Sequence, residues 1–135
     1  MCSQFWGAHL SALDNNLTIV LALEPFDKGL FSHGSESAYP PDRSHAIFPS
    51  SLTVEWLNAS LDETMASALR QISNTIRAVA IADGQDVLDA ALYPNYALFG
   101  TSLNDMYGGN VERLRQIRAE IDPEYVMNLA GGWRF

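Results

Sequence analysis

Residues 91–135 read ALYPNYALFG TSLNDMYGGN VERLRQIRAE IDPEYVMNLA GGWRF, and the rest of the chain is predicted to support this stretch. An aromatic and amide cluster opens the stretch and consists of Tyr93, Asn95 and Tyr96. A turn, a short helix and a Gly-Gly-aromatic tail follow in that order. We take the cluster as the candidate functional site, although the sequence shows no complete active site around it.

The apolar run at 87–99 predicts a strand that carries this cluster. Pro94 lacks a backbone N–H, so the strand is expected to lie at a sheet edge or to be distorted there. Gly-Gly-Asn at 108–110 predicts a turn, followed by a helix that extends through 120. Asp122-Pro123 predicts a last helical turn, because proline is tolerated at the first helical position. Gly131-Gly132 then allows a close backbone turn before the final aromatic residues.

Two strands are predicted upstream. Residues 17–24, LTIVLALE, are almost continuously apolar, which indicates a strand buried on both faces. Residues 51–58, SLTVEWLN, alternate apolar and polar side chains, which indicates a half-buried strand. The Pro-, Gly- and Ser-rich stretch 26–50 between them predicts a long irregular loop. His33 and His45 in that loop have no acidic or cysteine partners at ligand spacing, so no metal site is predicted.

A helix is predicted over 61–82. Ser60 and Glu63 have the spacing of a capping box, in which each side chain satisfies a free backbone N–H at the helix start. Gly84 predicts the end of the helix. Apolar residues that are alternately four and three positions apart form one stripe along this helix. Its members are Met65, Leu69, Ile72, Ile76 and Val79. Such a stripe packs against a sheet far more often than it contacts a ligand.

These elements predict an α+β fold. We expect an antiparallel or mixed sheet of three to five strands, with helices packed on one face. The helices at 61–82 and 110–120 would cover that face. A length of 135 residues suits one domain, and no internal repeat divides it.

Charge and composition exclude some classes of partner. The chain has 16 acidic against 8 basic residues, a net charge of −8. Such a surface repels phosphates, so neither nucleic acid nor an anionic membrane is an expected partner. Cys2 is the single cysteine, which excludes an internal disulfide. No signal-peptide pattern and no apolar run of about eighteen residues occurs, so a cytoplasmic location is expected.

Four sequence blocks near the C-terminus together resemble a known family. They are Tyr-x-Asn-Tyr-Ala from Tyr93, Met-Tyr-Gly-Gly-Asn-Val-x-Arg-Leu-Arg from Met106, Asp-Pro-x-x-Val-Met from Asp122 and Gly-Gly-Trp-Arg-Phe from Gly131. In this order they resemble the C-terminal end of berberine-bridge-enzyme-like FAD-linked oxidoreductases, the fungal branch above all. The resemblance extends over most of the chain, from about residue 17 onward.

The resemblance implies a role for each residue of the cluster. Residues 1–135 would form one domain similar to the substrate-binding half of these oxidases, with 91–135 as the berberine-like segment. Tyr93 would face the substrate as the catalytic base. Asn95 would orient Tyr93 or bond the flavin, and Tyr96 would also serve cofactor binding. On a strand, Tyr96 would point away from Tyr93, because alternate side chains diverge.

The resemblance also implies partners. The cofactor would be FAD, which the family holds mostly on a separate domain, and the substrate a small molecule of secondary metabolism. The chain is therefore expected to need a flavin-bearing polypeptide and not to be redox-active alone. It could be a truncated product, half of a split enzyme or a repurposed small protein.

Two other functions remain open. One is a non-redox cyclase or isomerase that uses the substrate pocket between the sheet and loop 26–50. The other is a non-catalytic module that forms a homodimer, because an apolar sheet face that lacks its covering domain drives association.

Overall fold

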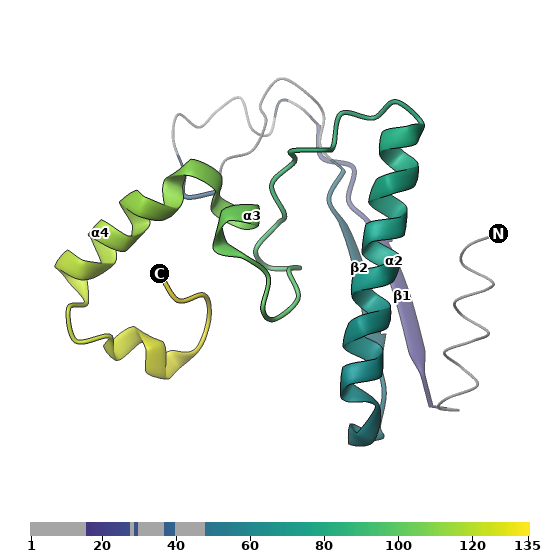
Figure 1. The fold of residues 1–135 in the computed structure, drawn as a ribbon, viewed down its shortest axis with the longest axis horizontal. Helices are drawn as coiled ribbons and strands as arrows, with labels where there is room; N and C mark the ends of the chain where they lie inside the picture. Colours follow the sequence, from purple (N-terminus) through teal and green to yellow (C-terminus); the bar gives the residue numbers. More distant parts are fainter. Residues whose placement is uncertain (1–15, 28, 30–36, 40–47) are drawn as a thin grey trace. The chain divides into compact units, whose positions relative to one another are not determined.

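The computed structural model describes residues 16–27, 29, 37–39 and 48–135 (Figure 1). The chain separates into two compact units. The strand–helix unit comprises Met1–Phe26 and Phe48–Asp89, and the C-terminal unit comprises Asp27–Ile47 and Ala90–Phe135. Most of the predicted loop 26–50, including His33 and His45, lies outside the described residues.

Two antiparallel strands form the sheet of the strand–helix unit. β1 is Thr18–Leu23 and β2 is Ser50–Glu55, with Thr18 opposite Glu55 and Leu23 opposite Ser50. Both strands were predicted from the sequence, and together with the helices they confirm the α+β class. The predicted number of three to five strands is not confirmed, because the described residues contain two.

The prediction that the first strand is buried on both faces is wrong. Val20, Leu21 and Leu23 are 48%, 57% and 67% exposed. β1 is hydrogen-bonded to β2 alone among the described residues, and the packed core of this unit lies between β2 and the long helix. The apolar run therefore fits an outer strand as well as an inner one.

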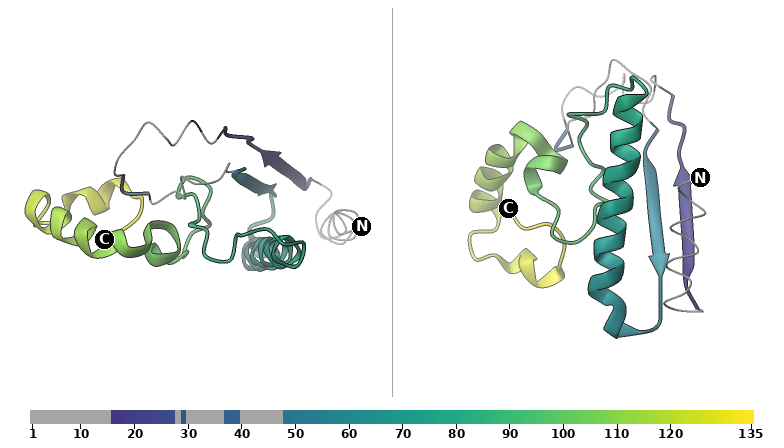
Figure 2. Two further views of the ribbon diagram at one scale, coloured as in Figure 1. Left: turned by 90° about the horizontal axis from the view of Figure 1, so that it is seen from above. Right: turned by 45° about the vertical axis from the view of Figure 1, so that its right-hand side comes forward.

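The long helix α2, Asp62–Ala82, runs along one face of this sheet and confirms the helix predicted at 61–82 (Figure 2). Val54 of β2 packs with Met65 and Ala68 of α2, and Met65 is fully buried. In the predicted apolar stripe, the first half contributes to this core. Ile76 and Val79, in the second half, are 45% and 60% exposed.

The start of α2 differs from the predicted capping box. The N-cap residue is Leu61, and its side chain makes no capping hydrogen bond. The Asn58 Oδ1 atom instead accepts hydrogen bonds from the Ser60 N–H and hydroxyl, at 3.1 and 2.8 Å. These bonds open a single 3-10 turn, η2, over Ala59–Leu61, which moves the polar cap upstream of the α-helix.

A side-chain hydrogen bond joins the start of α2 to the residue after β2, and a glycine marks the end of α2. Trp56 Nε1, just after β2, donates to Asp62 Oδ1 at 2.7 Å in the first helical turn. At the other end Gly84 has a φ of +87°, a left-handed conformation that favours glycine. The predicted stop at Gly84 is therefore confirmed.

The C-terminal unit is built from short helices. α3 is Leu103–Tyr107, the 3-10 turn η3 is Gly108–Asn110, and α4 is Val111–Ile121. The turn at 108–110 and the helix after it were predicted, but α3 was not. Its Ser102 cap, whose hydroxyl accepts from the Asn104 N–H at 3.1 Å, is the signal that could have located it.

A 3-10 turn replaces the predicted helical start at Pro123. The Asp122 carboxylate accepts from the Val126 and Met127 N–H groups at 2.8 and 3.0 Å, and so caps η4, Val126–Ala130. Tyr125, just before η4, has a left-handed φ of 58° and breaks the helical path. No helix in the described part of the chain is long and apolar enough to cross a membrane.

Candidate functional site

The predicted strand at 87–99 is wrong, because the cluster sits on a turn. The Tyr96 N–H donates to the Tyr93 carbonyl at 3.0 Å, which closes a four-residue turn over Tyr-Pro-Asn-Tyr. Proline favours the second position of such turns because its φ is already set, and asparagine tolerates the third. Pro94 is thus the residue that makes the turn and does not mark a distorted strand. The Pro-Asn pair was the sequence signal for it.

The turn brings the three predicted site residues together. Asn95 Nδ2 donates to the Tyr93 hydroxyl oxygen at 2.9 Å. The Tyr93 and Tyr96 rings meet edge to face, with centroids 5.0 Å apart and an interplanar angle of 85°. The expectation that Tyr96 would point away from Tyr93 is therefore wrong, since it depended on strand geometry.

A fourth residue, Tyr39, joins this cluster and was missed in the sequence. Its ring meets the Tyr93 ring edge to face at 5.8 Å, and its hydroxyl donates to the Ala91 carbonyl at 3.0 Å. Burial raises the pKa of Tyr39 above 10.0, and the charge of Tyr93 when ionised raises it further. Tyr39 lies 54 positions before Tyr93, and no motif in the predicted loop distinguishes it.

The backbone around Tyr93 is held on both sides. The Leu92 N–H donates to the Asp105 carbonyl at 2.8 Å, and Trp133 Nε1 donates to the Pro94 carbonyl at 3.2 Å. Trp133 follows Gly131 and Gly132, whose φ angles are +84° and +86°. The close backbone turn predicted for these glycines is confirmed, and it directs the C-terminal tail to the site.

The Gly-Gly-Asn block supports the site through Asn110. Its Nδ2 atom donates to the Ser37 and Ala38 carbonyls, each at 3.1 Å. At the end of α3, just before this block, the Tyr107 ring meets the Phe135 ring edge to face with centroids 5.1 Å apart, and burial raises the pKa of Tyr107. Asn110 therefore holds the segment before Tyr39, and the neighbouring Tyr107 contacts Phe135.

The cluster presents polar groups to solvent from a fixed backbone. Tyr93 is half-buried, Asn95 is exposed and Tyr96 is 42% exposed. The Tyr93 hydroxyl oxygen accepts from Asn95, and a hydroxyl group can donate a hydrogen bond as well as accept one. The Asn95 side-chain oxygen is an acceptor beside it. No group of three His, Cys, Asp or Glu side chains suited to a metal occurs among the described residues.

Comparison with known proteins supports the berberine-like resemblance. The family model described as "Berberine and berberine like" matches residues 93–130, which begin at Tyr93 and include Asn95, Tyr96 and Asn110. The resemblance predicted from the sequence blocks is confirmed over this segment.

One curated relative matches nearly the whole of this chain. The oligopeptidase PhomG' of Diaporthe leptostromiformis is 27% identical over 138 residues, which cover 96% of this chain. The matched part is 11% of that protein, so the chain spans about a tenth of its length. No solved structure matches the chain significantly.

The residues present suit a flavin in their chemistry. The ring system of a flavin is flat and aromatic, with hydrogen-bond donors and acceptors along one edge. The Tyr93 and Tyr96 rings offer aromatic contact surface, and the exposed Asn95 amide offers both a donor and an acceptor. This set of donors and acceptors fits the edge of a flavin.

Proposed function

We propose that this chain provides the substrate-facing wall of an FAD-linked oxidoreductase acting on a small molecule of secondary metabolism. The flavin would be held by another body, either a further domain or a separate polypeptide. The proposal is carried by the Asn95–Tyr93 hydrogen bond of 2.9 Å, which fixes a phenol within the berberine-like segment.

In this proposal each residue of the cluster has one task. The bound flavin supplies hydride acceptance. Tyr93, in its deprotonated form, takes the proton from the substrate group that is oxidised and becomes the neutral phenol, since a positioned side chain in hydrogen-bond reach is what general-base catalysis requires. Asn95 orients the Tyr93 hydroxyl. Tyr96 packs against the Tyr93 ring and adds aromatic surface for the cofactor.

The flavin dependence is tested with the purified chain. We expect the chain alone to be colourless and to leave the fluorescence of added FAD unchanged. Addition of an FAD-loaded flavin domain, prepared from a berberine-like oxidase without its own substrate domain, should change the flavin spectrum and yield a complex. If no complex forms and the spectrum stays constant, the proposal is wrong. A chain that binds FAD by itself would contradict the assignment of the flavin to another body.

A homodimerising module is the second candidate, and the exposure of β1 favours it. The strand carries no charge, and Val20, Leu21 and Leu23 are about half to two-thirds exposed. Uncharged, exposed outer strands pair readily with a further strand.

Sedimentation equilibrium checks this second candidate. We expect a concentration-dependent dimer that Leu21→Lys converts to a monomer, because a buried charge in the paired sheet would be unfavourable. Leu129→Lys, at an 89% exposed position outside β1, serves as the matched control. A wild-type chain that stays monomeric at high concentration would exclude the dimer.

A further inference from the structure

The turn that carries Tyr93 is supported by a segment remote in sequence. Residues 37–39 reach it through Tyr39, whose hydroxyl donates to Ala91, two residues before Tyr93. The Tyr39 ring also meets the Tyr93 ring edge to face, with centroids 5.8 Å apart. Tyr39 therefore restrains both the backbone that leads into the turn and the Tyr93 ring itself.

Asn110 holds that segment in place. One amide nitrogen donates to two successive carbonyls, those of Ser37 and Ala38, immediately before Tyr39. The Ser37 hydroxyl also donates to the Tyr39 carbonyl. Two bonds from a single amide fix the direction in which the chain enters Tyr39. Asn110 belongs to the Met-Tyr-Gly-Gly-Asn block, to which the proposed chemistry assigns no role.

We propose that Tyr39 is a positioning residue for Tyr93 and that Asn110 fixes Tyr39 in that place. The inference rests on the proposed function in one respect, the catalytic role given to Tyr93. Tyr39 is not itself assigned to catalysis, because its only hydroxyl hydrogen is donated to a backbone carbonyl. Its partial burial also keeps the phenol neutral, and thus a donor, to higher pH than a free tyrosine.

The test uses the whole chain with tyrosines labelled with ¹³C at Cζ, and NMR signals assigned by single Tyr→Phe variants. Titration follows the Tyr39 signal, whose neighbouring titratable group is Tyr93. Asn110→Ala removes the amide, and Asn110→Asp keeps its shape but cannot donate. Asn110→Ala should lower the pKa of Tyr39 as burial is lost, and both variants should shift the Tyr93 signal.

Two further variants complete the test. Asn104→Ala, an exposed asparagine on α3, should leave the Tyr39 and Tyr93 signals unchanged. Tyr39→Phe removes one hydroxyl, so it keeps the test decisive if an Asn110 variant fails to fold. It should shift the Tyr93 signal, and adding Asn110→Ala to it should shift that signal by less than the sum of the two single changes, because both act through Tyr39.

The outcomes separate this inference from the proposed function. An unchanged Tyr93 signal in folded Tyr39→Phe and Asn110 variants would overturn the positioning role, whatever the redox result. Conversely, the signals could shift as expected while flavin reduction by substrate, in a complex with the FAD-loaded domain, stays unaffected by Tyr39→Phe and by Tyr93→Phe. That result would support the positioning role and reject the proposed catalytic role of Tyr93.

Discussion

Replacement of Met65 by alanine is expected to lower the free energy of unfolding by about 2–5 kcal/mol. Met65 is fully buried between α2 and β2, where it packs with Val54 and Ala68. Its loss removes apolar contacts and leaves a cavity in a core with few other buried side chains among the described residues. Because small domains are stable by only about 5–15 kcal/mol, this is a large fraction of the total.

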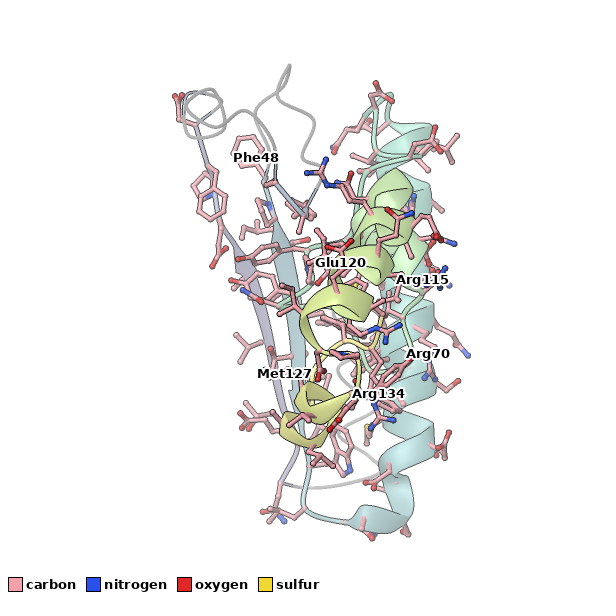
Figure 3. The ribbon with its side chains drawn as sticks, turned by 90° about the vertical axis from the view of Figure 1, so that its left-hand side faces the viewer. Phe48, Arg70, Arg115, Glu120, Met127 and Arg134 are labelled. Atoms are coloured by element: carbon pink, nitrogen blue, oxygen red, sulfur yellow. The ribbon has the colours of Figure 1, made fainter. Side chains whose placement is uncertain are left out.

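Urea unfolding followed by circular dichroism measures this change. Met127→Ala is the matched control. Met127, labelled on η4 in Figure 3, is 66% exposed, so its replacement should change the free energy of unfolding by less than about 0.5 kcal/mol. Met65→Leu, which nearly conserves volume, should lose under about 1.5 kcal/mol. Equal effects of Met65→Ala and Met127→Ala would show that the α2–β2 contact does not form the core.

The helices and strands of the strand–helix unit could be predicted because their signals are local. The four-three spacing after Met65 and the glycine at position 84 define α2 without knowledge of its partners. The burial of β1 could not be predicted, because an apolar run gives the same pattern in an inner and an outer strand. Whether β1 is an inner or an outer strand depends on which other segments pack against it, and the apolar run does not specify those segments.

The site shows a different limit. The three residues Tyr93, Asn95 and Tyr96 were identified, but the strand assigned to them ignored the turn preference of Pro94 and Asn95. Tyr39 could not be found, since its contact with Tyr93 joins positions far apart in sequence. Long-range contacts of this kind follow from tertiary packing, for which a single sequence carries no periodic signal.

Replacement of Tyr93 by phenylalanine is expected to slow substrate oxidation by about 10²–10⁴-fold. The variant keeps the ring that packs against Tyr39 and Tyr96, so the turn should remain folded. It removes the hydroxyl to which Asn95 donates, and with it the proposed proton acceptor. The measurement is the stopped-flow rate of flavin reduction by substrate, in the complex of the chain with the FAD-loaded domain.

Tyr125→Phe is the matched control for this measurement. Tyr125 packs under the Arg118 guanidinium, 3.9 Å from its ring centroid, and phenylalanine preserves that ring. The control should reduce the flavin at the wild-type rate. An unchanged rate in Tyr93→Phe would remove the base from the proposed mechanism. Turnover of a substrate without any flavin, lost in Tyr93→Phe and kept in Tyr125→Phe, would instead favour the cyclase or isomerase, since Tyr93 would then act without a hydride acceptor.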